Sequence, residues 1–243
     1  MLQLNTGKSS LGSGMYGQSF SDMLTKAQKS TAYFYDVLNR YESAPVEGKN
    51  NDIEEEPVPS TSLGAKLDVV KKLIWARNER KVERDVFFVT LSGFDHHKEL
   101  LPRQKEKLDE INSALKGFIT SMKVSGVWDN IVVASASDFG RTLTANSNAG
   151  SDHSWASHHF IAGSSVKGGQ VFGHYPQTLE LDGDIILDRG RVVPTMANEA
   201  YWNGILEWFG VQDSELDRVL PNRKSTAKLF SERDMFYNHN GVE

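Results

Sequence analysis

The chain has 243 residues, of which 24% are charged and 39% hydrophobic, proportions that are typical of a globular protein. A net charge of −5 gives no basic surface for nucleic acid, and no apolar run approaches the roughly 20 residues of a membrane span. The polar, Ser/Gly-rich residues 1–17 are not expected to form a signal peptide. Because the chain has no cysteine, disulfides, thiolate metal sites and cysteine nucleophiles are excluded.

The first 80 residues show helical patterns separated by a polar stretch. Apolar spacing predicts a helix over residues 18–41, and the charged, proline-containing residues 42–60 indicate a loop or linker. Thr61 and Ser62 are candidates to cap the next helix, which shows apolar residues at helical spacing up to Ile74. Nothing before residue 85 has the pattern of a strand.

A strand, a long helix and a second strand follow. They are predicted over residues 85–92, 98–124 and 130–136. Continuous apolar strands around a helix are typical of a parallel sheet buried on both faces, so we expect adjacent or near-adjacent parallel strands joined by a crossover helix. The predicted fold class is α/β, a partial doubly wound, mostly parallel sheet flanked by helices. Such a sheet needs more strands than these, so we expect the chain to be half of a larger domain, completed by another segment or chain.

The remaining elements are shorter. We expect a strand at 158–162, a small hairpin between 184–187 and 191–193, and a last helix at 196–209. The predicted organisation has three parts: a helical amino-terminal segment with a charged linker (1–60), an α/β half-domain (61–225) and a tail (226–243).

Three polar clusters lie near the ends of the predicted strands. They are Asp95-His96-His97, then Asp138 with Arg141 close by, and then the Asp152-His153 stretch with His158-His159 behind it. Ligands bind beyond the carboxyl ends of parallel strands, so the clusters are expected at one edge of the sheet. Imidazole with carboxylate suits Zn²⁺, Mn²⁺ or Fe, and carboxylate-rich sites suit Ca²⁺ or Mg²⁺. A divalent ion there would polarise a phosphoryl or sulfuryl oxygen.

Each cluster also has an ordinary structural explanation. An Asp-x-His at a strand end can cap a loop, Arg141 can form a local ion pair, and Asp152 can cap a helix or turn. The adjacent rings at 158–159 can simply be hydrogen-bonded. Other chemistries have less support, because the chain has no nucleophile elbow, no P-loop and no glycine-rich dinucleotide motif.

Five segments resemble, in order, the bacterial family catalogued as domain of unknown function 1501. They are "FFVTLSGFDHHKELLPRQ", "VASASDFGRTL", "GSDHSWASHHFIAGSSVKGGQVFGHYP", "RGRVVPTM" and "LEWFGVQDSELDRVLPN". They span about residues 61–222, and a weaker likeness over 18–41 extends the match. The family looks like a branch of the alkaline phosphatase and sulfatase superfamily, whose members use one or two metal ions on such a sheet.

The resemblance implies a site for a divalent metal ion, Zn²⁺, Mn²⁺ or Ca²⁺. The implied ligands are Asp95, His97, Asp138 and His153, with His96, Asp152 and Arg141 as additional candidates. The chain departs from the pattern in two places. Alkaline phosphatases usually carry Asp-His where this chain has Asp138-Phe139, which argues against a two-zinc site, and the family usually has Thr where His96 stands.

Two functions are compatible with this pattern. The resemblance implies the carboxy-terminal half of a metal-dependent phosphoester or sulfate-ester hydrolase, exported or periplasmic. Family members normally begin with an export signal and a half-domain that holds an early strand, a metal-binding Asp and the nucleophile region. We expect these to be missing here, and therefore expect an inactive chain that needs a partner chain or an amino-terminal half to complete the sheet. The alternative is a non-catalytic structural or assembly subunit, associating through its sheet edge.

Overall fold

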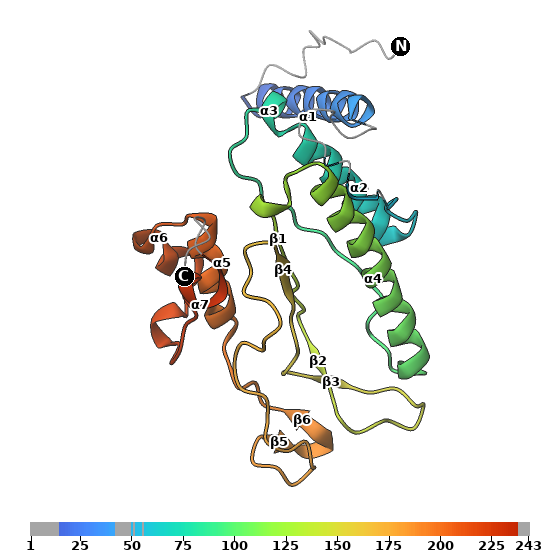
Figure 1. The fold of residues 1–243 in the computed structure, drawn as a ribbon, viewed down its shortest axis with the longest axis vertical. Coiled ribbons are helices and arrows are strands. Elements are labelled where there is room, and N and C mark those ends of the chain that lie inside the picture. Colours follow the sequence, from blue (N-terminus) through green and yellow to red (C-terminus); the bar gives the residue numbers. More distant parts are fainter. Residues whose placement is uncertain (1–14, 42–49, 51, 55, 238–243) are drawn as a thin grey trace.

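The computed structural model describes residues 15–41, 50, 52–54 and 56–237 (Figure 1). Most of the linker predicted over 42–60 therefore lies outside the described residues. The helices are α1 (Met15–Arg40), α2 (Ser62–Trp75), α3 (Arg77–Arg80), α4 (Leu100–Val124), α5 (Asn198–Phe209), α6 (Asp213–Val219) and α7 (Glu232–Met235). The strands are β1 (Val132–Ala134), β2 (Gly140–Arg141), β3 (His153–Ser154), β4 (Ile161–Gly163), β5 (Ile186–Leu187) and β6 (Arg191–Val192).

The helices follow the apolar periodicity of the sequence. The predictions over 18–41, 98–124 and 196–209 correspond to α1, α4 and α5. The expected cap of α2 is also present, since the Thr61 hydroxyl accepts a hydrogen bond from the Gly64 amide at 3.2 Å. This bond satisfies one of the amide groups that the first turn of a helix leaves free.

Helices α2 and α4 pack against each other around one apolar core. Leu67 and Trp75 of α2 meet Phe118 and Met122 of α4, all of them buried. The indole Nε1–H of Trp75 donates to the Ser125 hydroxyl at 2.7 Å, so the one polar group of this indole is satisfied inside the core. Burial of these side chains supplies the driving force for the α2–α4 unit.

The strand predicted over 85–92 is not formed. The segment has no regular secondary structure, although its side chains alternate as in a strand. Phe87 and Val89 pack on the α2–α4 core, whereas Val86 and Phe88 are 79% and 90% exposed. A strand needs a hydrogen-bonded neighbour, and none of the paired strands in the described part of the chain joins this segment.

Strand β1 lies between two apolar clusters. Its antiparallel partner is β4, with Val133 opposite Ala162. Val133 contacts the α2–α4 core, while Val132 contacts a second core built around α5 and α7. Each face of β1 is thus covered, as its continuous apolar sequence indicated. Segment 85–92 and β1 both lead away from the α3 end, and α4, which connects them in the sequence, runs in the opposite direction (Figure 1).

The short strand pairs β2–β3 and β5–β6 position the polar clusters. The hairpin predicted between 184–187 and 191–193 is confirmed as β5–β6, with Ile186 opposite Val192. It is attached to the other pair because the Val192 amide donates to the Ser154 hydroxyl at 3.1 Å and the Leu143 amide donates to the Gly190 carbonyl at 2.9 Å. Among the helices that the structure describes, none combines the length and apolar character that crossing a bilayer requires.

Candidate metal centre

Two of the three converging side chains come from a tight turn after the extended segment. The amide of His96 donates to the Phe94 carbonyl at 2.9 Å, and that of His97 donates to the Asp95 carbonyl at 3.1 Å. Alternate side chains therefore point in different directions: His96 is 6% exposed, whereas the side chains of Asp95 and His97 are 57% and 45% exposed. Gly93 permits the turn by adopting a left-handed φ of 97°.

The third side chain comes from β3, where His153 lies opposite Arg141 of β2. The loop before β3 runs against the Asp95–His97 turn, and the Ser151 amide donates to the His96 carbonyl at 3.2 Å. Gly150 makes this approach possible, because a Cβ there would lie 2.1 Å from the carbonyl carbon of His97. Two segments far apart in the sequence are thereby placed side by side.

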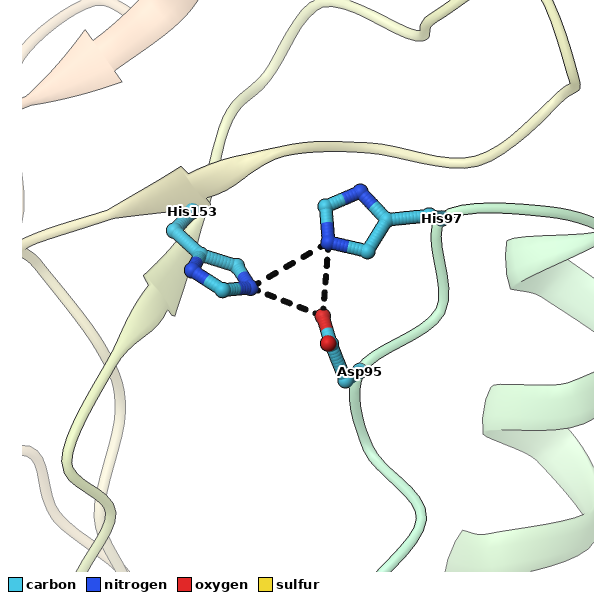
Figure 2. Close-up of side chains that lie close together, drawn as sticks. All are labelled: Asp95, His97 and His153. Carbon is cyan, nitrogen blue, oxygen red and sulfur yellow. Dashed lines mark hydrogen bonds and ion pairs between the residues drawn. The ribbon is translucent and has the colours of Figure 1, made fainter.

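The three side chains converge on one point (Figure 2). Asp95 Oδ1 lies 2.7 Å from His153 Nε2 and 2.9 Å from His97 Nε2, and the two Nε2 atoms are 3.3 Å apart. Ligand atoms of a tetrahedral zinc site, each at ~2.0–2.1 Å from the ion, lie roughly 3.3 Å from one another. These three residues therefore form a group that could hold a metal ion.

Asp95 is surrounded by positive and hydrogen-bonding groups. The hydrogen bond from His153 lowers the pKa of Asp95, and one from Arg141, at 2.9 Å to the same oxygen, acts in the same direction. Arg141 is itself fixed by donating to the carbonyls of Phe94 and Ser151. The Asp95 carboxyl is therefore held in its ionised form, which is the form that binds a cation.

Asp152 lies behind His97 rather than beside the other ligands. Its Oδ1 is 3.2 Å from His97 Nδ1, and its Oδ2 accepts a hydrogen bond from Arg189. Burial raises the pKa of Asp152, but the charge of Arg189 and hydrogen bonds from Asn146 and His97 outweigh it and lower that pKa. The contact with Arg189 ties this part of the site to the β5–β6 hairpin.

The other predicted residues occupy different places. Asp138 is exposed in the connection between β1 and β2 and is not a member of the converging group. The ring of Phe139, which stands where the resemblance would place a second imidazole, packs at 4.6 Å from the ring of His153. His96 points inward, and its buried Nε2 has no hydrogen-bond partner among the residues that the structure describes.

Arg189 and Asn146 are the participants that sequence reasoning missed. Asn146 donates to the His97 carbonyl at 3.1 Å and accepts from the Gly150 amide at 3.0 Å, so it holds the loop against the turn. Both residues lie in loops without periodicity, and their roles depend on contacts with segments distant in the sequence. The sequence offered one weak signal for each: Asn146 lies between two of the polar clusters, and Arg189 lies in the turn of the predicted hairpin.

Comparison with known proteins identifies one family. The model of the family described as "Protein of unknown function (DUF1501)" matches residues 24–181, more than half of the chain. The matched region contains Asp95, His97 and His153. No curated protein and no solved structure matches the chain.

Proposed function

Since the chain belongs to the DUF1501 family of proteins of unknown function, we propose that it is a metal-binding part of a phosphoester or sulfate-ester hydrolase. In this proposal Asp95, His97 and His153 hold one divalent ion. The observation that carries it is the convergence of one carboxylate oxygen and two imidazole nitrogens within 3.3 Å of one another.

The donor set favours Zn²⁺ over Ca²⁺. Two imidazoles and one carboxylate are common ligands of zinc and related transition metals, whereas Ca²⁺ takes six to eight oxygen ligands. Three protein ligands also leave a fourth position open, as in catalytic rather than structural zinc sites. The half-exposed side chains of Asp95, His97 and His153 would leave that position accessible to water or substrate.

The chain's own residues prepare the site for such an ion. An ion at this point would replace the proton by which His153 Nε2 is hydrogen-bonded to Asp95, and the lone pairs of the two nitrogens and the carboxylate oxygen would then hold it. Arg141 keeps Asp95 ionised and oriented. A bound Zn²⁺ would polarise a phosphoryl or sulfuryl oxygen and lower the pKa of a coordinated water.

We also propose that the fold is half of an alkaline phosphatase-like sheet. Support comes from β1, which is covered on both faces, and from segment 85–92, which runs in the same direction and is joined to β1 through α4. The exposed Val86 and Phe88 point to the opposite face and would be covered by helices packed on that face, once this segment gains a strand neighbour and becomes part of a sheet. In this proposal the neighbour comes from another part of a longer protein or from a partner chain.

The settings of the serines near the site support the alternative, a non-catalytic subunit that retains the fold. Hydrolysis needs an oriented nucleophile in addition to an ion. Of three serines near the polar clusters, Ser137 donates to the Phe139 carbonyl, and Ser151 and Ser154 are buried. We therefore expect this chain alone to hydrolyse nitrophenyl phosphate and nitrophenyl sulfate very slowly or not at all with added Zn²⁺ or Mn²⁺. Turnover that Asp95→Ala abolishes would show instead that the chain is a complete enzyme.

Calorimetric titration with Zn²⁺ tests the metal site directly. The metal-free chain should bind one ion, and Asp95→Ala, His97→Ala and His153→Ala should each weaken binding by more than the roughly 10–100-fold typical of losing an outer hydrogen-bond partner. His174→Ala is the matched control, because His174 is exposed and outside the converging group. Equal affinity in all variants would refute the site.

A further inference from the structure

We infer that Asp152 is a positioning residue that fixes the tautomer of His97, and that Arg189 holds Asp152 in place for this purpose. The inference rests on the proposed metal site at Asp95, His97 and His153, and it assigns Asp152 a role other than that of a metal ligand.

The first argument is the direction of the two nitrogens of His97. Nε2 faces Asp95 and His153, whereas Nδ1 faces Asp152 Oδ1 at 3.2 Å. The lone pairs of the two ring nitrogens diverge, so an ion bound at Nε2 lies on the far side of the ring from Asp152. Asp152 can therefore accept a hydrogen bond from Nδ1 while Nε2 binds the ion.

The second argument is competition for one proton. A neutral imidazole carries a single N–H, and either carboxylate can accept it, since Asp95 Oδ1 lies 2.9 Å from Nε2. If the proton sits on Nε2, His97 becomes a hydrogen-bond donor to Asp95 and cannot bind a metal ion there. If Asp152 draws the proton to Nδ1, the Nε2 lone pair is free. The carboxylate of Asp152 thus decides whether His97 is a ligand.

The third argument is the way Asp152 is held. Its backbone is fixed on both sides by Thr142, whose amide donates to the Asp152 carbonyl at 2.9 Å and whose hydroxyl accepts from the Asp152 amide at 3.0 Å. Its second oxygen accepts from Arg189, a residue with a left-handed φ of 62° in the turn between β5 and β6. A non-glycine residue in this conformation is uncommon and carries strain. The turn between β5 and β6 keeps Arg189 in this conformation, in which its guanidinium donates a hydrogen bond to Asp152.

The test combines Zn²⁺ affinity, the visible spectrum of the Co²⁺-substituted chain and the ¹⁵N chemical shifts of the His97 ring. The shifts are recorded on the metal-free chain at alkaline pH. Asp152→Ala should weaken Zn²⁺ binding roughly 10–100-fold, leave the number of Co²⁺ ligands unchanged, and move the His97 proton from Nδ1 toward Nε2. Asp152→Asn, which keeps the shape and one acceptor oxygen but loses the charge, should give a smaller effect in the same direction and serves if the alanine variant does not fold.

Arg189→Asn tests the second half of the inference, because asparagine tolerates the left-handed conformation. It should weaken Zn²⁺ binding less than Asp152→Ala does, and the double variant should bind no more weakly than Asp152→Ala alone. Asp188→Asn is the matched control: it lies in the same turn, its side chain is 84% exposed, and its ion-pair partner is Arg191. It should leave affinity and spectra unchanged.

The outcomes separate the two proposals. If the wild-type chain binds no Zn²⁺, the proposed metal site is wrong, while the ¹⁵N shifts still decide whether Asp152 sets the His97 tautomer. If the wild type binds Zn²⁺ but both Asp152 variants keep its affinity and tautomer, the site stands and the inference fails. A Co²⁺ spectrum that shows one ligand fewer in Asp152→Ala would also overturn the inference, because Asp152 would then be a ligand.

Discussion

The α2–α4 unit and the metal centre are held together by different forces. In the α2–α4 unit, buried apolar side chains such as Phe118 and Met122 meet across two helices. Around the metal centre, backbone hydrogen bonds and partly exposed polar side chains join the 94–99 turn to the loop that precedes β3. The difference indicates that the α2–α4 unit supplies stability, whereas the polar segments supply a geometry that can be lost without unfolding the chain.

The largest expected effect is on the stability of the α2–α4 unit. Phe118 is 2% exposed in the centre of this core, and Phe118→Ala should lower the free energy of unfolding by about 3–5 kcal/mol because it leaves a cavity. Urea unfolding monitored by circular dichroism measures this. Leu101→Ala on the same helix is the control, since Leu101 is 81% exposed. Variants that are still folded should keep the wild-type affinity for Zn²⁺.

A smaller effect on stability but a larger one on the site is expected for Gly150→Ala. The added Cβ would lie 2.1 Å from the carbonyl carbon of His97, so the turn and the loop must separate. We expect a loss of about 1–3 kcal/mol in stability and a Zn²⁺ affinity reduced by more than tenfold. Gly168→Ala is the matched control, because a Cβ added there would lie 4.0 Å from the nearest atom, the carbonyl oxygen of Val166. If Gly150→Ala lowered stability but left Zn²⁺ affinity unchanged, the claim that the contact between turn and loop supplies the geometry of the metal centre would be wrong.

The same contrast explains which features could be predicted from the sequence. The periodicity of α4 and the turn of the β5–β6 hairpin are local patterns, and the structure contains both elements. A convergence of Asp95, His97, Asp138 and His153 was expected from their place after predicted strands and from the family resemblance, and the converging group contains all of these except Asp138. It depends on pairing between segments over 50 residues apart, which no local pattern specifies.

The strand predicted over 85–92 is not formed, and the role of Arg189 was not predicted, for related reasons. The continuous apolar run of 85–92 indicates a strand, but strand formation also requires a neighbour, and none pairs with it in the described residues. Arg189 has no partner nearby in the sequence, since Asp152 lies 37 residues away. Long-range polar contacts of this kind become visible only when the backbone is in place.

A hydrogen bond inside the α2–α4 core should contribute less to the free energy of unfolding than the apolar packing of that core does. Trp75→Phe removes the hydrogen bond to Ser125 and should cost about 1 kcal/mol in the free energy of unfolding, beyond the effect of the smaller ring. Trp208→Phe is a matched comparison, because the buried Nε1 of Trp208 has no hydrogen-bond partner in the described part of the chain. Urea unfolding should show the larger loss for Trp75→Phe, and the reverse order would contradict the assigned role of this hydrogen bond.

The smallest expected effect is a pH dependence of stability that arises beside β4, outside both regions. His159 is stacked at 5.9 Å on Tyr201, and burial lowers the pKa of His159 below its ordinary 6.5. The unfolded chain therefore binds this proton more readily than the folded chain. The contribution of neutral His159 is present above pH ~6.5 and is lost as the pH falls through the folded pKa. His159→Gln should make the free energy of unfolding less sensitive to pH between about 7 and 5, as urea titrations at each pH would measure.

His174→Gln, at an exposed histidine, should keep the wild-type slope. An unchanged slope in His159→Gln would show that the acid sensitivity does not arise at this residue.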